Sequence, residues 1–68
     1  MSEGLANRLR EAREGKGWTQ ADLAEKIGVS RKTINTVENG VFVPSTVIAL
    51  KLARVFGRRV EDLFSLER

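Results

Sequence analysis

Polar side chains that can hydrogen-bond to nucleic-acid bases and phosphates lie close together between two glycines, Gly28 and Gly40. If this segment is a helix, the apolar Ile34 and Val37 face the core, which leaves one polar side facing outward. An arginine there can donate two hydrogen bonds to guanine, a lysine can reach guanine or a phosphate, and a threonine can offer its methyl group to thymine. The pattern predicts binding to DNA by the outward-facing residues Arg31, Lys32, Asn35 and Thr36.

A second short helix and a glycine turn come directly before this segment. Thr19 is followed three residues later by Asp22, a spacing that resembles the capping box of a helix N-terminus. Gly28 suits the left-handed conformation at the end of that helix, and Ser30 is a good N-cap for the next one. Two short helices joined by a tight glycine turn are the layout of a helix-turn-helix, whose second helix enters the major groove of DNA.

The rest of the chain predicts supporting helices. Ser45, which follows the only proline, is a further N-cap, and the short apolar run before that proline gives no strand signal. We expect helices at about residues 3–16, 20–27, 31–39 and 46–56, and a last short turn near 60–64. The sequence therefore predicts a single all-α domain over residues 1–68, with an inward-facing set made of Leu5, Leu9, Ala12, Leu23, Ala24, Ile27, Ile34, Val37, Ile48, Leu52, Val55, Phe56 and Leu63.

Composition narrows the possible classes of function. The 68 residues include no cysteine and no histidine, so thiolate ligands, the commonest metal ligand and the usual general base are missing. We expect no catalysis, no cofactor and no metal site. The net charge of +3 favours a polyanionic partner, and the excess of arginine over lysine suits phosphate and guanine. No apolar run approaches the ~20 residues of a membrane span and no signal-peptide pattern opens the chain, so we expect a cytoplasmic protein.

With the helix order and turn spacing in place, the chain resembles the Cro/C1-type (XRE) helix-turn-helix family, which includes the repressors of phages lambda and 434. The resemblance extends from about Leu5 to Phe64. It implies a compact five-helix, lambda-repressor-like fold, binding to double-stranded DNA and regulation of transcription. The residues that carry it are Thr19-Gln20, Leu23-Ala24, Gly28-Val29-Ser30, Ile34, Val37-Glu38-Asn39-Gly40, Pro44-Ser45 and Glu61-Asp62-Leu63-Phe64.

The family also suggests a role for individual residues. Its equivalent of Gln20 contacts a DNA phosphate and braces a base-reading side chain, for which the first residue of the recognition helix is the candidate here. Family members read bases with the first, second and sixth residues of that helix, and Asn39 matches a phosphate contact. Together with the helix cap and its neighbours, the candidate DNA-binding residues are Gln20, Ser30, Arg31, Lys32, Thr33, Asn35, Thr36 and Asn39.

Two further side chains have expected structural roles. Arg13 continues the apolar stripe of the first helix, and an unpaired buried charge costs several kcal/mol. The family pairs an arginine and a glutamate at the positions of Arg13 and Glu38, so the resemblance implies an ion pair between the first and third helices. We expect Trp18 to pack over the corner between the first two helices rather than to form a stacking platform. Arg8, Arg10 and Lys16 are expected to be solvated.

The loop after Gly40 departs from the family, because Val41-Phe42-Val43 replaces residues that usually contact phosphate. Phe42 either folds back on the core or belongs to an exposed apolar patch that suggests a protein contact.

We expect a homodimer on a pseudo-palindromic operator, because one recognition helix covers only a few base pairs. Its candidate interface residues are Val60, Phe64 and Leu66. The alternative is a protein-interaction module, antirepressor-like or antitoxin-like, with secondary DNA binding.

Overall fold

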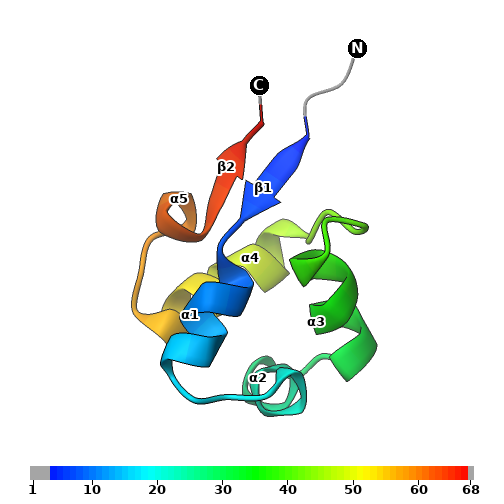
Figure 1. The fold of residues 1–68 in the computed structure, drawn as a ribbon, viewed down its shortest axis with the longest axis vertical. Helices are drawn as coiled ribbons and strands as arrows, with labels where there is room; N and C mark the ends of the chain where they lie inside the picture. The colour runs from blue at the N-terminus through cyan, green and yellow to red at the C-terminus, as the bar shows by residue number, and fades with distance from the viewer. Residues whose placement is uncertain (1–3, 68) are drawn as a thin grey trace.

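The computed structural model describes residues 4–67 and is mostly helical (Figure 1). Five helices and a two-stranded sheet make up this part of the chain, so the predicted five-helix class is confirmed, with the sheet as an addition. The sheet lies at one end of the long axis, and α2 lies at the other end (Figure 1). In chain order the elements are β1 (Leu5–Asn7), α1 (Leu9–Gly15), α2 (Gln20–Ile27), α3 (Arg31–Glu38), α4 (Thr46–Phe56), α5 (Val60–Leu63) and β2 (Phe64–Leu66).

Local side-chain caps define where the middle helices begin. The backbone N–H of Asp22 donates to Thr19 Oγ1 at 3.0 Å, and the N–H of Thr19 donates to the Asp22 carboxylate at 2.9 Å. Ser30 and Ser45 cap α3 and α4 through bonds from backbone N–H groups three residues later, at 3.1 and 3.2 Å. Gly28 has φ +76° at the end of α2, as its left-handed turn requires. The predicted bounds of α2 and α4 are confirmed, whereas α3 and α5 each end one residue earlier than predicted.

The first helix is shorter than predicted, and the missing part is a strand. Helix α1 begins at Leu9, while Leu5, Ala6 and Asn7 pair antiparallel with Leu66, Ser65 and Phe64. The expected start near Glu3 lies outside the described residues. The spacing of Leu5 and Leu9 imitates a helical stripe, and a strand of three residues has too few positions to display an alternating pattern. The pairing is also between segments that are far apart in the chain, so no local signal announces it.

The core gathers side chains from every helix. Its buried members are Leu9, Ala12, Leu23, Ala24, Ile27, Ile34, Val37, Leu52, Phe56, Leu63 and Phe64, while Leu5, Ile48 and Val55 pack against it only partly buried. Trp18 stacks on Phe56 with 5.5 Å between the ring centroids, and the Lys26 ammonium lies 4.6 Å from the Trp18 ring. Trp18 therefore packs against the core, as predicted, but its ring lies on α4 as well as beside α2.

Phe64 is buried in the core, whereas Phe42 lies at the surface. Phe64 is 7% exposed and belongs to the core, so the prediction that it serves a dimer interface is wrong for this fold. The physical reason is that β2 pairs with β1 and turns this side chain inward. Phe42 is 49% exposed between the more exposed Val41 and Val43, so the loop forms a surface patch instead of folding back.

None of the helices found within residues 4–67 is long and apolar enough to span a membrane.

Candidate nucleic-acid interface

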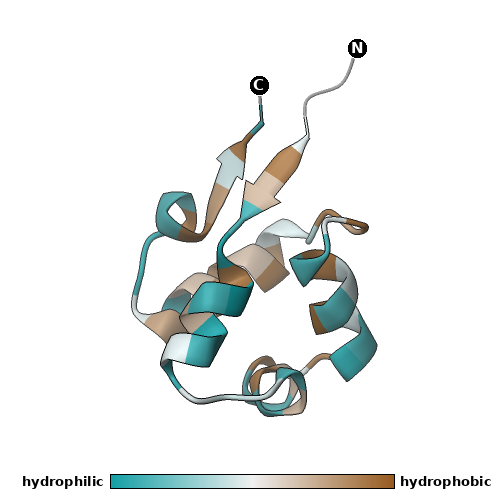
Figure 2. Ribbon diagram, viewed as in Figure 1, coloured by the Kyte–Doolittle hydropathy of each residue, from teal (hydrophilic) through white to brown (hydrophobic). Residues whose placement is uncertain are grey.

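The exposed side of α3 is polar and carries two cations at its beginning. Ile34 and Val37 are completely buried, and Figure 2 shows hydrophilic residues on the side of α3 that faces away from the other helices. Arg31, Lys32 and Asn35 are exposed on this helix. Neither cation forms an ion pair with another residue of the range 4–67. The structure therefore brings these three predicted residues together on one accessible face.

The hydroxyl groups on α3 are occupied mainly by the helix itself. Ser30 Oγ lies 3.0 Å from Thr33 Oγ1 while it caps the helix, and Thr36 Oγ1 donates to the Thr33 carbonyl at 3.0 Å. Thr33 and Thr36 are half-buried. The Thr36 hydroxyl proton is committed to this local bond, so the methyl group of Thr36 is the part of that side chain best suited to contact a base.

Gln20, at the start of α2, contacts α3 at a position that the sequence did not predict. Its Nε2 donates to Glu38 Oε1 at 3.1 Å, and its Oε1 accepts from Asn35 Nδ2 at 3.4 Å. The side chain that Gln20 contacts is thus Asn35, the fifth residue of α3, rather than Arg31, the first. The reason is geometric: the beginning of α2 faces the second half of α3, where both Asn35 and Glu38 lie.

A fully buried carboxylate, that of Glu38, holds α3 against two other elements. Arg13 donates to it from both Nε and Nη2, at 2.7 and 3.2 Å, and also donates from Nη1 to the Trp18 carbonyl at 2.9 Å. The side chains of Glu38 and Arg13 are 0% and 11% exposed. The predicted ion pair between the first and third helices is confirmed. It fixes the direction from which α3 presents its outer face.

Arg10 and Asn7 also contact the far end of α3. The side chain of Arg10 is 53% exposed, in keeping with the prediction that it is solvated, but its contacts with α3 were not predicted, and no role was predicted for Asn7. Arg10 donates to Asn39 Oδ1 at 3.1 Å, and its Nε lies 3.7 Å from Glu38 Oε1. Asn7 donates to the Val37 carbonyl at 3.0 Å. Arg10 precedes Arg13 by three residues, so their shared helix face was a usable signal. Asn7 lies in the unpredicted strand, and no local pattern indicated its contact.

Burial alone would raise the pKa of the Glu38 carboxyl group. The hydrogen bonds from Arg13 and Gln20, together with the charges of Arg13 and Arg10, outweigh burial, and the pKa lies below its ordinary value. Glu38 is therefore ionised at neutral pH, and a carboxylate in that state can only accept hydrogen bonds.

The apolar loop after α3 borders the same face. The N–H groups of Val41 and Phe42 both donate to the Thr36 carbonyl, at 2.9 and 3.2 Å, which ties the loop to the end of the helix. A hollow of about 290 Å³ lies between the helix and the loop, lined by Ser30, Lys32, Thr33, Thr36, Val41 and Phe42. The loop thus extends the candidate interface with apolar rather than cationic side chains.

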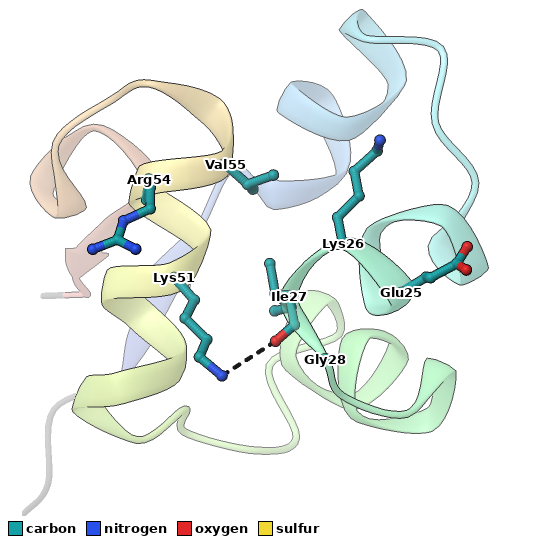
Figure 3. Close-up of a pocket in the computed structure, with 7 residues that line it drawn as sticks. All are labelled: Glu25, Lys26, Ile27, Gly28, Lys51, Arg54 and Val55. Atoms are coloured by element: carbon teal, nitrogen blue, oxygen red, sulfur yellow. Dashed lines mark hydrogen bonds between the residues drawn. The ribbon is translucent and has the colours of Figure 1, made fainter.

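Another hollow lies between the end of α2 and the side of α4 (Figure 3). Lys51 crosses it and donates to the Ile27 carbonyl at 3.4 Å, which places a cation at the C-terminus of α2. Arg54 lines the same hollow, and no residue of α3 contributes to it. These cations are therefore separate from the polar face of α3.

Comparison with known proteins agrees with this geometry. A family model described as helix-turn-helix matches residues 9–63. A transcriptional regulator of the HTH type from Archaeoglobus fulgidus is 50% identical over 60 residues, covering 88% of this chain and 86% of its own. The HTH-type regulator YgzD of Bacillus subtilis is 40% identical over 63 residues, covering 93% of this chain and 96% of its own. The chain therefore belongs to the Cro/C1-type helix-turn-helix family of transcriptional regulators.

A solved structure with the same fold gives a further point of comparison. The restriction-modification controller protein C.AhdI of Aeromonas hydrophila superposes with a TM-score of 0.74 at 37% identity, over 79% of this chain and 82% of that protein. At that identity the likeness supports the family as well as the fold.

The buried pair makes a prediction about stability. Replacing Arg13 by Met or Glu38 by Leu removes one charge and leaves its partner buried, so each variant should lose about 3–5 kcal/mol of unfolding free energy. The double variant should recover part of this loss. Urea melts of the two single variants and the double variant measure it. The control is Arg59→Ala, whose pair with Asp62 is exposed and should contribute at most about 1 kcal/mol. Small and additive losses for Arg13 and Glu38 would contradict a buried pair.

The lowered pKa of Glu38 makes a prediction about acid stability. The pKa of the Glu38 carboxyl group is lower in the folded state than in the unfolded state, where glutamate has a pKa of about 4.3. Its ionised form therefore stabilises the fold above the unfolded pKa, and this stabilisation is lost as the pH falls through the folded pKa. The urea midpoint should therefore fall on acidification below about pH 4. The pKa values of Asp22 and Asp62 are also lowered, by bonds from the backbone N–H groups of Thr19 and Arg59, and contribute in the same range. NMR titration of the Glu38 carboxyl carbon separates the contribution of Glu38 from those of the two aspartates. A Glu38 pKa at or above the ordinary value for glutamate would refute the prediction.

Proposed function

We propose that this regulator binds double-stranded DNA in a sequence-specific way by placing α3 in the major groove. The observation that carries the proposal is the position of two cations, Arg31 and Lys32, which form no ion pair within residues 4–67. They lie at the exposed beginning of a helix that a buried ion network holds in place. A fixed helix is required because base recognition depends on side chains that reach set positions in the groove.

The residues divide into those suited to bases and those suited to the backbone. The guanidinium of Arg31 matches O6 and N7 of guanine, and Lys32 can reach the same edge or a phosphate. The methyl group of Thr36 suits thymine. Ser30, Thr33, Asn39 and Gln20 lie at the ends and edges of this face, where contacts with phosphate set the register of the helix on the duplex.

Replacement of Arg31 by alanine tests the assignment. The variant should lose discrimination at one base pair, worth about 1–3 kcal/mol, because its two hydrogen bonds to guanine disappear. The site is first selected from random duplex DNA with the unaltered protein at a stated salt concentration, and every single-base variant of that site is then titrated. Arg54→Ala is the matched control, because it removes the same charge from the separate α4 hollow. An unchanged preference profile for Arg31→Ala would remove the proposed role.

We also propose that the protein acts as a homodimer on a pseudo-palindromic operator. A single α3 contacts too few base pairs to select one site in a genome, and a two-fold dimer doubles them. Phe64 is committed to the core, so the remaining apolar residues near the end of the chain are Leu66, which is 63% exposed, and the half-buried Val60.

The dimer proposal predicts two chains for each operator and half-sites about 34 Å apart. Affinity should fall steeply with added salt, as counterions are released from the phosphates. Footprinting and light scattering of the complex measure both the site and the stoichiometry. Leu66→Glu should weaken the dimer, whereas Ser65→Glu places the same charge on the opposite side of the strand and should not. A footprint of one half-site with one chain would refute the dimer and leave DNA binding intact.

A further inference from the structure

Three side chains form a hydrogen-bonded relay from the interior to the outer face of α3. Glu38 accepts from Gln20, and Gln20 accepts from Asn35. We propose that this relay turns the carbonyl oxygen of Asn35 toward the DNA, so that Asn35 reads a base carrying an exocyclic amino group, adenine or cytosine. The inference rests on the proposed function of α3 and adds the chemical class of base that one position selects.

The first step of the relay is the orientation of the Gln20 amide. Glu38 Oε1 is a buried carboxylate oxygen that already accepts from Arg13 Nη2 at 3.2 Å. It has no proton to donate, so the group that Gln20 presents at 3.1 Å must be its NH₂. The opposite orientation would bring two acceptor oxygens within 3.1 Å of each other beside a buried carboxylate, which is unfavourable.

The second step transfers that constraint to Asn35. With its nitrogen on Glu38, Gln20 directs its Oε1 to Asn35, and an amide oxygen can only accept. Asn35 must therefore present its own NH₂ to Gln20, 3.4 Å away. The Asn35 oxygen lies on the other branch of the planar amide, on an exposed residue of the recognition helix. Gln20 and Glu38 are thus positioning residues, and Asn35 is the residue that contacts the base.

An outward acceptor discriminates between base edges in the major groove. Adenine and cytosine present amino donors there, at N6 and N4, whereas guanine and the oxygen of thymine present only acceptors. An asparagine whose amide could flip freely would bind either a donor or an acceptor on the base edge, because its carbonyl oxygen and its NH₂ could exchange places. The relay biases the Asn35 amide toward one orientation, and a buried carboxylate thereby influences which bases a side chain at the surface favours.

Binding-site selection with the whole protein tests the inference. The unaltered chain should prefer adenine or cytosine at one position, and Asn35→Ala should reduce that preference by about 2- to 10-fold, the range of one hydrogen bond. Gln20→Ala keeps Asn35 but releases its amide, so it should weaken the preference at the same position. The preference at the position read by Arg31 is the internal control and should persist in both variants.

Base analogues separate the amino group from the rest of the base pair. Purine in place of adenine, or pyrimidin-2-one in place of cytosine, lacks the exocyclic amino group and should weaken binding of the unaltered protein by the same factor. The same analogue should not change the affinity of the Asn35→Ala variant for the DNA. A preference for guanine or thymine at that position would overturn the inference, as would a profile that Asn35→Ala leaves unchanged.

A measurement without DNA separates this inference from the proposed function. The side-chain amide ¹⁵N resonances of Gln20 and Asn35 should both follow the titration of Glu38, and in Gln20→Ala the Asn35 resonance should cease to follow it. If no sequence is enriched by the unaltered protein, the proposed function fails, and base reading by Asn35 fails with it. If sequences are enriched but the Asn35 amide is insensitive to Glu38, the relay is overturned and the proposed function stands.

Discussion

The fully buried carboxylate of Glu38 is the interaction on which the rest of this small structure depends. A charge in such a position must be compensated, and here Arg13 of α1, Gln20 of α2 and Arg10 of α1 all converge on it. Three helices are consequently related to one another by directional bonds as well as by apolar contact. Apolar packing tolerates small slippage, whereas a bidentate arginine–carboxylate pair has one geometry. The orientation of α3 is therefore specified by directional bonds in addition to the apolar core.

Sequence patterns identified the parts of this fold that are determined locally. The caps at Thr19, Ser30 and Ser45 act within three residues of themselves, so the beginnings of α2, α3 and α4 could be read directly from the chain. The strand at residues 5–7 could not, because it exists only by pairing with residues 64–66. For the same reason Phe64 was wrongly predicted to lie at a surface, because only the pairing of the two strands reveals that its side chain turns inward.

The candidate interface shows a similar division. The outward positions of Arg31, Lys32 and Asn35 follow from helical periodicity and the buried positions of Ile34 and Val37. The partner of Gln20 depends on how α2 crosses α3, which no spacing in the sequence encodes, and this is why Asn35 rather than Arg31 is its neighbour. The apolar character of the 41–43 loop was visible in the sequence, while its attachment to the Thr36 carbonyl required the structure.

The pairing of Leu5 with Leu66 joins the first described segment to the last across 61 positions of the chain. During synthesis on the ribosome the helices can form as each emerges, because their hydrogen bonds and caps are local. The sheet must wait for residues 64–66, and closing so long a loop costs entropy that only the completed core can offset. A nascent chain stalled before Leu63 would contain the whole of α3, yet it would lack the strand pairing and the two buried side chains that complete the core, Leu63 and Phe64. Completion of this fold is thus coupled to the emergence of residues 63–66 from the ribosome.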